Sequence, residues 1–185
     1  MKASSKFIGV CQVSEGEENP GVPPPNQVSP QSLGFTDVVE DSDGVLRRHL
    51  LAMTPAEPCD TDKSFSFQLA ERYLAQENRR IELNPPKNSE SGEKLMLSYL
   101  ESNSGSYSNI DSLGYQVMLN WRSTPEIATR VTLFDVLNNK IKPDLIKDKI
   151  VIIGTTAESF NNYWLTPYSN ATSTKNKIPG LIIHA

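Results

Sequence analysis

The sequence predicts an α/β fold in which helices pack on a mixed central β-sheet, with more strand than helix. Runs of β-branched and aromatic residues outnumber the stretches with helical spacing. One run, residues 149–154, is apolar on both faces, which is typical of a central strand. Because 185 residues can close one sizeable core, we expect residues 1–185 to form a single domain.

The first third of the chain predicts strands separated by one long loop. Residues 6–13 are apolar and β-prone, so they predict a strand. Residues 14–33 carry five prolines, which exclude a regular element there. Residues 34–40 and 45–53 flank an Asp-Ser-Asp-Gly sequence, and two β-prone runs around an Asp-Gly turn predict a β-hairpin.

The middle of the chain predicts one helix and two strands. Residues 64–78 repeat apolar side chains at helical spacing, and the predicted apolar face consists of Phe65, Leu69, Ala70, Tyr73 and Leu74. Residues 94–100 predict a short strand. Residues 115–121 alternate, which predicts a half-buried strand whose inward face carries Tyr115, Val117, Leu119 and Trp121.

The last third predicts a short helix and two strands. Thr132 and Asp135 have the spacing of a capping box, with Asp in place of the usual Glu or Gln, so a helix is expected to run to Asn138. Residues 149–154 predict the buried central strand, and residues 181–183 predict another strand.

Charge and composition exclude several classes of function. The net charge is −4 and no basic stripe is present, so no nucleic-acid partner is expected. No apolar run approaches the roughly 18 residues that span a bilayer. The first residues lack the apolar core of a signal peptide, and both ends have the character of a fragment of a longer chain.

The chemistry-bearing residues predict neither a metal, nor a cofactor, nor catalysis. Two cysteines and two histidines cannot by themselves form a structural zinc site, and glycine-rich phosphate-binding motifs are absent. Gly-x-Ser-x-Gly is also absent, and nothing in the sequence places His49 or His184 beside a nucleophile. We therefore expect no catalytic residue.

The predicted hairpin carries charged residues that fit more than one reading. Asp41-x-Asp43-Gly44 begins like a calcium loop, but Leu46 and Ala52 stand where that loop needs Gly and Glu, so an Asp-rich turn is favoured. Arg47 and Arg48 are adjacent, and adjacent side chains of a strand point to opposite faces. We expect one arginine to be solvated and the other to pair inward with an acid.

The end of the predicted central strand is a second candidate site. Gly154, Thr155 and Thr156 follow the apolar run, and ligands of open α/β sheets gather beyond the carboxyl ends of strands. Backbone N–H groups and hydroxyls there would suit an anion. The alternative is a tight turn whose hydroxyls cap the next segment.

Seven motifs in order give the chain a family resemblance. They are Gly34-Phe35, Asp41-x-Asp-Gly-Val-x-Arg-Arg48, Ser66-Phe-Gln-Leu-Ala70, Lys149-Ile-Val-Ile-Ile-Gly-Thr-Thr-Ala157, Thr166-Pro167, Pro179-Gly180 and His184-Ala185. From about residue 7 to the end, the chain resembles the second class of CHASE domains, the cyclase- and histidine-kinase-associated sensory extracellular domains. It departs from the family pattern at Asn162, where an Asp is usual, and in lacking a strand-helix region before Lys6.

The resemblance implies a sensor and not an enzyme. It implies a bacterial membrane protein whose sensory domain lies outside the cytoplasm, is followed by its own C-terminal transmembrane helices, and controls a cytoplasmic output domain such as a peptidase-like module, cyclase or kinase. The domain would respond to an unknown small-molecule or environmental signal. Whether it forms a homodimer stays an open question on the sequence. Together with the strand-end rule, these motifs predict one ligand-binding group made of Arg47, Arg48, Gly154, Thr155, Thr156 and Thr166.

We also predict a disulfide between Cys11 and Cys59, because such bonds persist outside the cytoplasm. Cys59 lies in a polar loop where a free thiol would be exposed, and Cys11 ends the first predicted strand. The loop and hairpin between them are long enough to return the chain to the same edge of the sheet. The alternative is two separate buried thiols.

Two other functions stay open on the sequence. One is a hydrolase that uses Thr155 or Thr156 with His184. The other is a structural dimerisation module. Turnover of ester or phosphate substrates would favour the first, and concentration-dependent mass without ligand stabilisation would favour the second.

Overall fold

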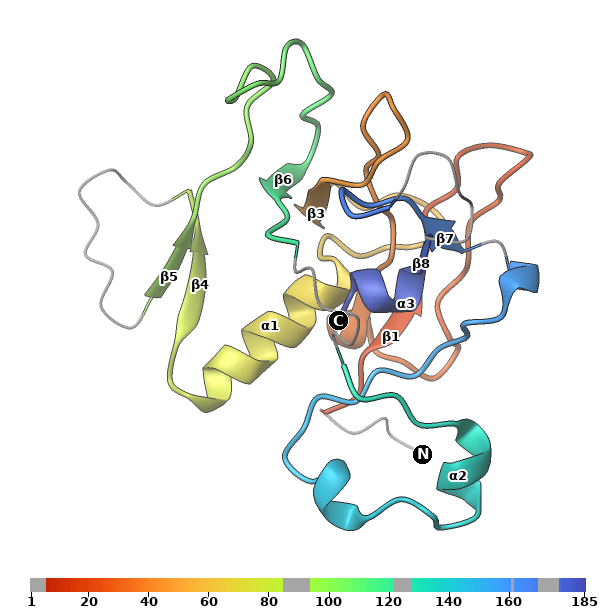
Figure 1. The fold of residues 1–185 in the computed structure, drawn as a ribbon. Helices are drawn as coiled ribbons and strands as arrows, with labels where there is room; N and C mark the ends of the chain where they lie inside the picture. The colour runs from red at the N-terminus through yellow and green to blue at the C-terminus, as the bar shows by residue number, and fades with distance from the viewer. Residues whose placement is uncertain (1–5, 85–93, 122–127, 161, 170–176) are drawn as a thin grey trace. The chain divides into compact units, whose positions relative to one another are not determined.

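The computed structural model describes residues 6–84, 94–121, 128–160, 162–169 and 177–185 (Figure 1). The chain forms two compact units, Met1–Leu119 and Asn120–Ala185. Strand exceeds α-helix and the strands pair both parallel and antiparallel, so the predicted mixed α/β class is confirmed. No described helix has the length and apolar character needed to cross a bilayer.

The described residues of the first unit form six short strands and one long helix. In chain order they are β1 (Gly9–Cys11), a 3-10 turn (Pro30–Ser32), β2 (Leu33–Phe35), β3 (Arg48–Ala52), α1 (Phe65–Gln76), β4 (Arg80–Leu83), β5 (Lys94–Leu97) and β6 (Tyr115–Met118). β1 pairs with β2 in parallel and β3 with β6 antiparallel, while β4 and β5 form a separate parallel pair. Single bridges from Ser64 to Phe35 and from Lys63 to Ala52 join the first two pairs, so the sheet expected at the centre is built from small pieces.

The predicted hairpin is only partly formed. Its turn exists, since Asp41 N–H donates to the Val45 carbonyl at 3.1 Å and Gly44 N–H to the Asp41 carbonyl at 2.8 Å. Its arms, however, meet at one bridge, Val39 with Arg48, because β2 pairs with β1 and β3 pairs with β6. The proline-rich loop provides the long crossover that two parallel strands such as β1 and β2 require.

The core of the first unit is built around the predicted disulfide. Cys11 and Cys59 are bonded, lie 48 positions apart in the sequence, and are 1% and 0% exposed. Phe35 and Leu50 complete the buried cluster. The prediction of this bond is confirmed, and it fastens the end of β1 to the loop that precedes α1.

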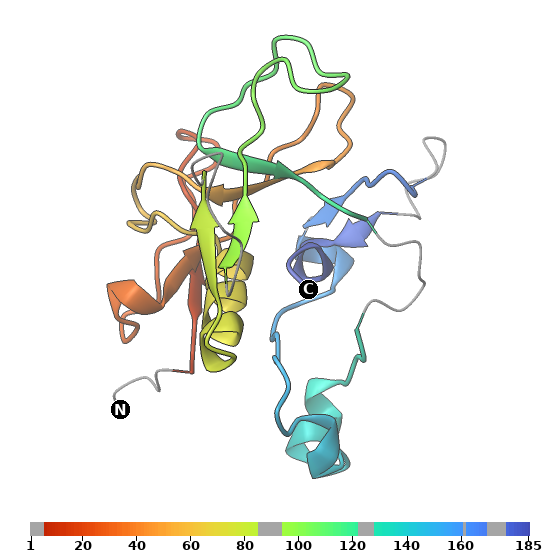
Figure 2. The same ribbon diagram turned by 90° about the vertical axis from the view of Figure 1, so that its left-hand side faces the viewer.

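Helix α1 begins where the sequence predicts and contacts β2, β3 and β4 (Figure 2). The Ser64 hydroxyl caps it by accepting from Phe67 N–H at 3.3 Å. Its buried residues are Phe65, Phe67 and Gln68, whereas Tyr73 of the predicted apolar face is 49% exposed. The buried residues of α1 therefore all lie in its first turn.

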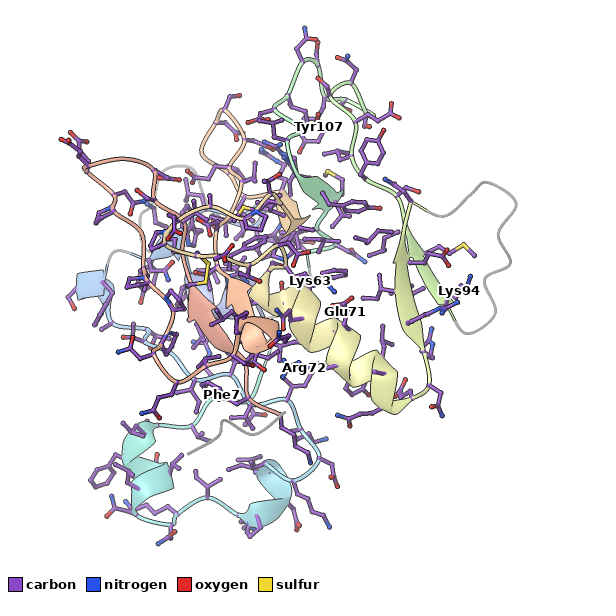
Figure 3. The ribbon with its side chains drawn as sticks, turned by 180° about the vertical axis from the view of Figure 1, so that it is seen from behind. Phe7, Lys63, Glu71, Arg72, Lys94 and Tyr107 are labelled. Atoms are coloured by element: carbon purple, nitrogen blue, oxygen red, sulfur yellow. A yellow bond between two sulfur atoms is a disulfide. The ribbon has the colours of Figure 1, made fainter. Side chains whose placement is uncertain are left out.

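Two hydrogen bonds from Arg72 and one ion pair of Glu71 fasten α1 to its surroundings (Figure 3). Arg72 donates to the Phe7 carbonyl at 3.1 Å and to the Gln31 carbonyl at 3.0 Å. Lys63 pairs with Glu71 at 2.7 Å. These contacts connect the helix to the chain before β1 and to the end of the proline-rich loop.

The second unit contains α2 (Leu133–Leu137), 3-10 turns at Pro143–Leu145 and Glu158–Phe160, β7 (Tyr163–Trp164), β8 (Ile178–Pro179) and α3 (Gly180–Ile183). β7 and β8 pair antiparallel. The N-cap half of the predicted capping box is confirmed: Asp135 N–H donates to the Thr132 hydroxyl at 3.1 Å, and that hydroxyl donates to the Asp135 carboxylate at 2.6 Å.

Two strand predictions in the second unit are wrong. Residues 149–154 form no strand, and Ile150, Val151 and Ile153 are 51%, 53% and 88% exposed. A run of apolar residues becomes a buried strand only if other strands pair with it, and no described strand does so. Residues 181–183 are helical, because Pro179 and Gly180 end β8 and begin α3.

Removing the disulfide is expected to lower the free energy of unfolding by about 4 kcal/mol, since it closes a loop of 48 residues in the unfolded chain. Urea unfolding of oxidised and reduced protein, with Cys11→Ala/Cys59→Ala as a third sample, measures this. Equal midpoints for oxidised and reduced protein would contradict the stabilising role.

Gly34→Ala is expected to cost about 1–3 kcal/mol of stability by overpacking. A Cβ on Gly34 would lie 2.5 Å from Phe65 Cα and 2.7 Å from its N, both rigid backbone atoms. Gly9→Ala is the matched control, because a Cβ there meets only the Val28 side chain, at 3.0 Å. Thermal unfolding of both variants compares them, and a larger loss in Gly9→Ala would refute the packing argument.

Candidate functional site

The first unit has an open pocket of about 490 Å³ beside the turn that precedes β3. Its lining residues are Asp41, Asp43, Arg47, Leu100, Ser104, Gly105, Ser106, Tyr107 and Met118. They come from the turn, from the loop between β5 and β6, and from the end of β6. Tyr107 marks this loop in Figure 3.

One carboxylate organises the charges of the pocket. Asp41 accepts hydrogen bonds from Arg48 Nε at 2.7 Å, from Arg47 Nη1 at 2.8 Å and from the Tyr107 hydroxyl at 2.9 Å. Its side chain is only 8% exposed. We call these four residues the Asp41 cluster. Three donors compensate the burial of one negative charge, as a buried carboxylate requires.

Arg48 is the structural arginine of the cluster. Its side chain is 4% exposed, and its remaining N–H groups donate to the carbonyls of Glu40 and Asp111 and to the Gln116 side chain, at 3.0, 2.9 and 2.7 Å. Its guanidinium also lies 5.6 Å from the centre of the Tyr107 ring. Arg48 therefore binds the turn, the loop and β6 to β3.

Arg47 is the arginine that faces the pocket. It is 33% exposed and donates to both oxygens of Asp43, from Nη1 to Oδ1 at 2.9 Å and from Nη2 to Oδ2 at 2.8 Å. The prediction of one inward and one solvated arginine is thus confirmed for Arg48. Arg47 is also ion-paired, because Asp41 lies between the two guanidinium groups.

The cluster shifts the acidities of its members. Burial raises the pKa of Asp41, but the hydrogen bonds from Arg47, Arg48 and Tyr107 outweigh it, so the pKa lies below its ordinary 3.8. The hydrogen bonds from Arg47 lower the pKa of Asp43 to about 2. Burial, together with the hydrogen bond to Asp41, raises the pKa of the Tyr107 hydroxyl. The carboxyl groups of Asp41 and Asp43 are therefore charged near neutral pH, and the Tyr107 hydroxyl is neutral.

Gln116 is a residue that the sequence prediction missed. The predicted inward face of its strand was the one with Tyr115 and Val117, but Gln116 is 2% exposed, whereas both of these are partly exposed. Its amide nitrogen donates to the Leu113 carbonyl at 2.7 Å while its oxygen accepts from Arg48. The one available signal was a polar side chain among β-prone residues. That signal could not reveal the role of Gln116, because its partner Arg48 lies on another strand.

The predicted ligand-binding residues fall into both units. Arg47 and Arg48 belong to the Asp41 cluster of the first unit. In the second unit, the Thr155 hydroxyl accepts from Ala157 N–H at 3.2 Å, and the Thr156 carbonyl accepts from the Tyr163 hydroxyl at 2.6 Å. The Thr166 hydroxyl accepts from Tyr168 N–H at 3.3 Å. That these residues gather with Gly154 into one site stays a prediction.

A buried histidine-serine contact was also not foreseen. His49 Nε2 lies 2.5 Å from the Ser66 hydroxyl and 3.5 Å from that of Ser64, at the start of α1. His49 is 5% exposed and is not among the residues that line the pocket. We interpret the contact as an anchor between β3 and α1. Across the described ranges, no three His, Cys, Asp or Glu side chains are grouped to hold a metal ion.

Replacing the two arginines by methionine is expected to separate their roles. Arg48→Met leaves the buried Asp41 carboxylate with fewer donors, so the loss of stability should be about 3–5 kcal/mol. Arg47→Met also removes a donor from Asp41, but because Arg47 is 33% exposed and water can take its place, the loss should be smaller, about 1 kcal/mol. Urea unfolding of both variants measures the difference. Equal losses would contradict the assignment of Arg48 as the structural arginine.

The pKa shifts predict an acid-dependent loss of stability. A carboxyl whose pKa is lower in the folded than in the unfolded chain stabilises the fold above the unfolded value and loses this effect as pH falls through the folded value. For Asp43 that window runs from pH 3.8 down to about 2. Asp43→Asn should therefore flatten the fall in unfolding free energy across it. Asp60→Asn, an exposed acid outside the pocket, is the control and should leave the slope unchanged.

Comparison with known proteins identifies one family. The model of the CHASE2 domain matches residues 3–185. Neither the search of curated proteins nor the search of solved structures returns a match. Since the family model spans nearly the whole chain, the protein belongs to the CHASE2 domain family, a family of extracellular sensory domains.

Proposed function

We propose that this chain is the extracytoplasmic sensory domain of a bacterial membrane signalling protein. The observation that carries the proposal is the Cys11–Cys59 disulfide at the centre of the core. A buried structural disulfide suits an oxidising compartment and is rare where thiols are kept reduced. Membership of a family of extracellular sensory domains supports the same placement.

In this proposal the domain binds a signal and passes a change of conformation to membrane helices that follow its C-terminal end. The catalytic output belongs to a separate cytoplasmic part. Two conformations with different affinity for the signal are sufficient for such a switch.

One backbone hydrogen bond links a residue of the pocket to the last residue of the first unit. Arg47 lines the pocket with its side chain, while its backbone carbonyl accepts a hydrogen bond from Leu119 N–H at 2.9 Å. Leu119 is the last residue of the first unit, and the chain continues at Asn120 into the second. In this proposal, a displacement of the Arg47 backbone moves Leu119, the last residue of the first unit.

The hydrolase alternative has weaker support. It requires Thr155 or Thr156 as a nucleophile, yet the Thr155 hydroxyl accepts the N–H of Ala157 within its own turn. A family of sensory domains also argues for binding over turnover.

The test of placement measures the oxidation state of the two cysteines in cells that make the full-length protein. Free thiols are blocked on acid-quenched cells, and the protein is then reduced and labelled with a maleimide polymer that adds mass to each released thiol. We expect two labels that appear only after reduction. The double variant Cys11→Ala/Cys59→Ala gives the background, and blocked, unlabelled Cys11 and Cys59 would contradict extracytoplasmic placement.

A further inference from the structure

The pocket already contains a carboxylate bound to Arg47, and it belongs to the chain itself. Asp43 receives two parallel hydrogen bonds from the outer edge of the guanidinium, at 2.9 and 2.8 Å. This two-pronged geometry is the one in which arginine recognises carboxylates. Asp43 thus occupies a position that would suit the carboxylate of a bound molecule.

The two acidic partners of Arg47 differ in how firmly they are held. Asp41 is 8% exposed and has three donors, so it cannot leave without exposing a buried network. The Asp43 side chain is 55% exposed and sits on a turn four residues before Arg47. An exposed ion pair of this kind contributes little to stability, so Asp43 can exchange its arginine for water at small cost.

Release of Asp43 leaves a site with the charge of one missing anion. Asp41, Arg47 and Arg48 then sum to −1 + 1 + 1 = +1, and a single carboxylate restores neutrality. The rest of the lining is neutral and includes the hydroxyl residues Ser104 and Ser106 and the apolar residues Leu100 and Met118. A cavity of about 490 Å³ lies within the range of small-molecule sites.

We propose that the pocket binds a small organic monocarboxylate with an apolar body, whose carboxylate replaces Asp43 on Arg47. This proposal rests on the sensory function proposed above and names the class of its signal. The apolar body lies against Leu100 and Met118, and Met118 is 51% exposed. Burying that surface adds to the affinity that the ion pair alone would not provide.

Other ligand classes fit the charges less well. An amine would pair with Asp43 and leave Asp41 as the one acidic partner of the Arg47 guanidinium among its described contacts. A phosphate dianion would bring the net charge of Asp41, Arg47, Arg48 and the ligand to −1. A monocarboxylate needs only the departure of the exposed Asp43.

The exchange also explains how binding would change the protein. Asp43 is joined to the turn by its own hydrogen bond from Val45 N–H, at 3.1 Å. When a ligand takes its place on Arg47, the link between the turn and Arg47 through Asp43 is broken. The Arg47 backbone, which holds Leu119, then depends on the ligand for part of its position.

The experiment uses the 185-residue chain and matched probes of the same size. Benzoate and hexanoate are the carboxylates, benzamide and hexanamide their neutral counterparts, and benzylamine the amine. Titration calorimetry gives Kd, and the Arg47 side-chain N–H resonance reports contact at the site. An acetylated tripeptide with a free or an amidated C-terminus distinguishes a peptide end from a free small acid as the source of the carboxylate.

Three variants make the proposal falsifiable. Asp43→Asn removes the competing carboxylate, so carboxylate Kd should fall about three- to tenfold, as expected when a larger fraction of sites is competent. Arg47→Lys keeps the charge but loses the two-pronged geometry, and Kd should rise about tenfold. Asp60→Asn, exposed and outside the pocket, should leave Kd unchanged.

Carboxylate binding with these changes, and no binding of the amides, supports the proposal. It is overturned if benzylamine binds more tightly than benzoate, if Asp43→Asn weakens binding, if Arg47→Lys leaves Kd unaltered, or if no carboxylate binds at millimolar concentration. Such a result would leave the sensory placement standing, because the test of placement reads Cys11 and Cys59 and not the pocket.

Discussion

The first unit depends on the buried carboxylate of Asp41. A charge that leaves water must be fully compensated, and here two guanidinium groups and a phenol hydroxyl supply the compensation. Arg48 in turn needs acceptors, which the loop and Gln116 of β6 provide. The requirement of one acid therefore fixes the turn, β3, β6 and the loop between β5 and β6 in one arrangement, and that arrangement forms the pocket. Asp43, which pairs with Arg47 outside the Asp41 cluster, stays exposed at the surface.

The disulfide stabilises the part of the first unit in which backbone pairing between strands contributes little. Strands of two to five residues bury little surface, and the proline-rich crossover cannot pair in a ladder. Cys11 and Cys59 join the end of β1 to the chain ahead of α1, and Phe35 and Leu50 pack around the bond. A covalent core and a rigid charge cluster leave the exposed turn as the part best able to respond to a ligand. This division suits a domain that must keep its fold while changing at one place.

Local signals in the sequence predicted local structure well. The Thr132 capping box, the Asp-Gly turn, the start of α1 and the disulfide all depend on residues whose chemistry acts nearby or on two cysteines alone. The partners of the strands could not be predicted, because pairing depends on which distant segment the chain returns to. The apolar run at residues 149–154 predicted a central strand because the sequence does not show whether another strand pairs with it. For the same reason Arg47 and Arg48 were found as candidates but Tyr107 and Gln116 were not, since their roles come from contacts 66 and 68 residues away.

The central claim is that Asp41 and Arg48 act as one buried unit, and a double-mutant cycle with Asp41→Asn and Arg48→Met tests it most directly. The free energies of unfolding of the wild type, both single variants and the double variant give the coupling. Because the two side chains share one buried network, we expect a coupling free energy of about 2 kcal/mol or more. The double variant should then lose less stability than the sum of the losses in the two single variants. A parallel cycle on Asp43 and Arg47 should give much smaller coupling. Additive losses of stability for Asp41→Asn and Arg48→Met would contradict the claim that the two residues act as one buried unit.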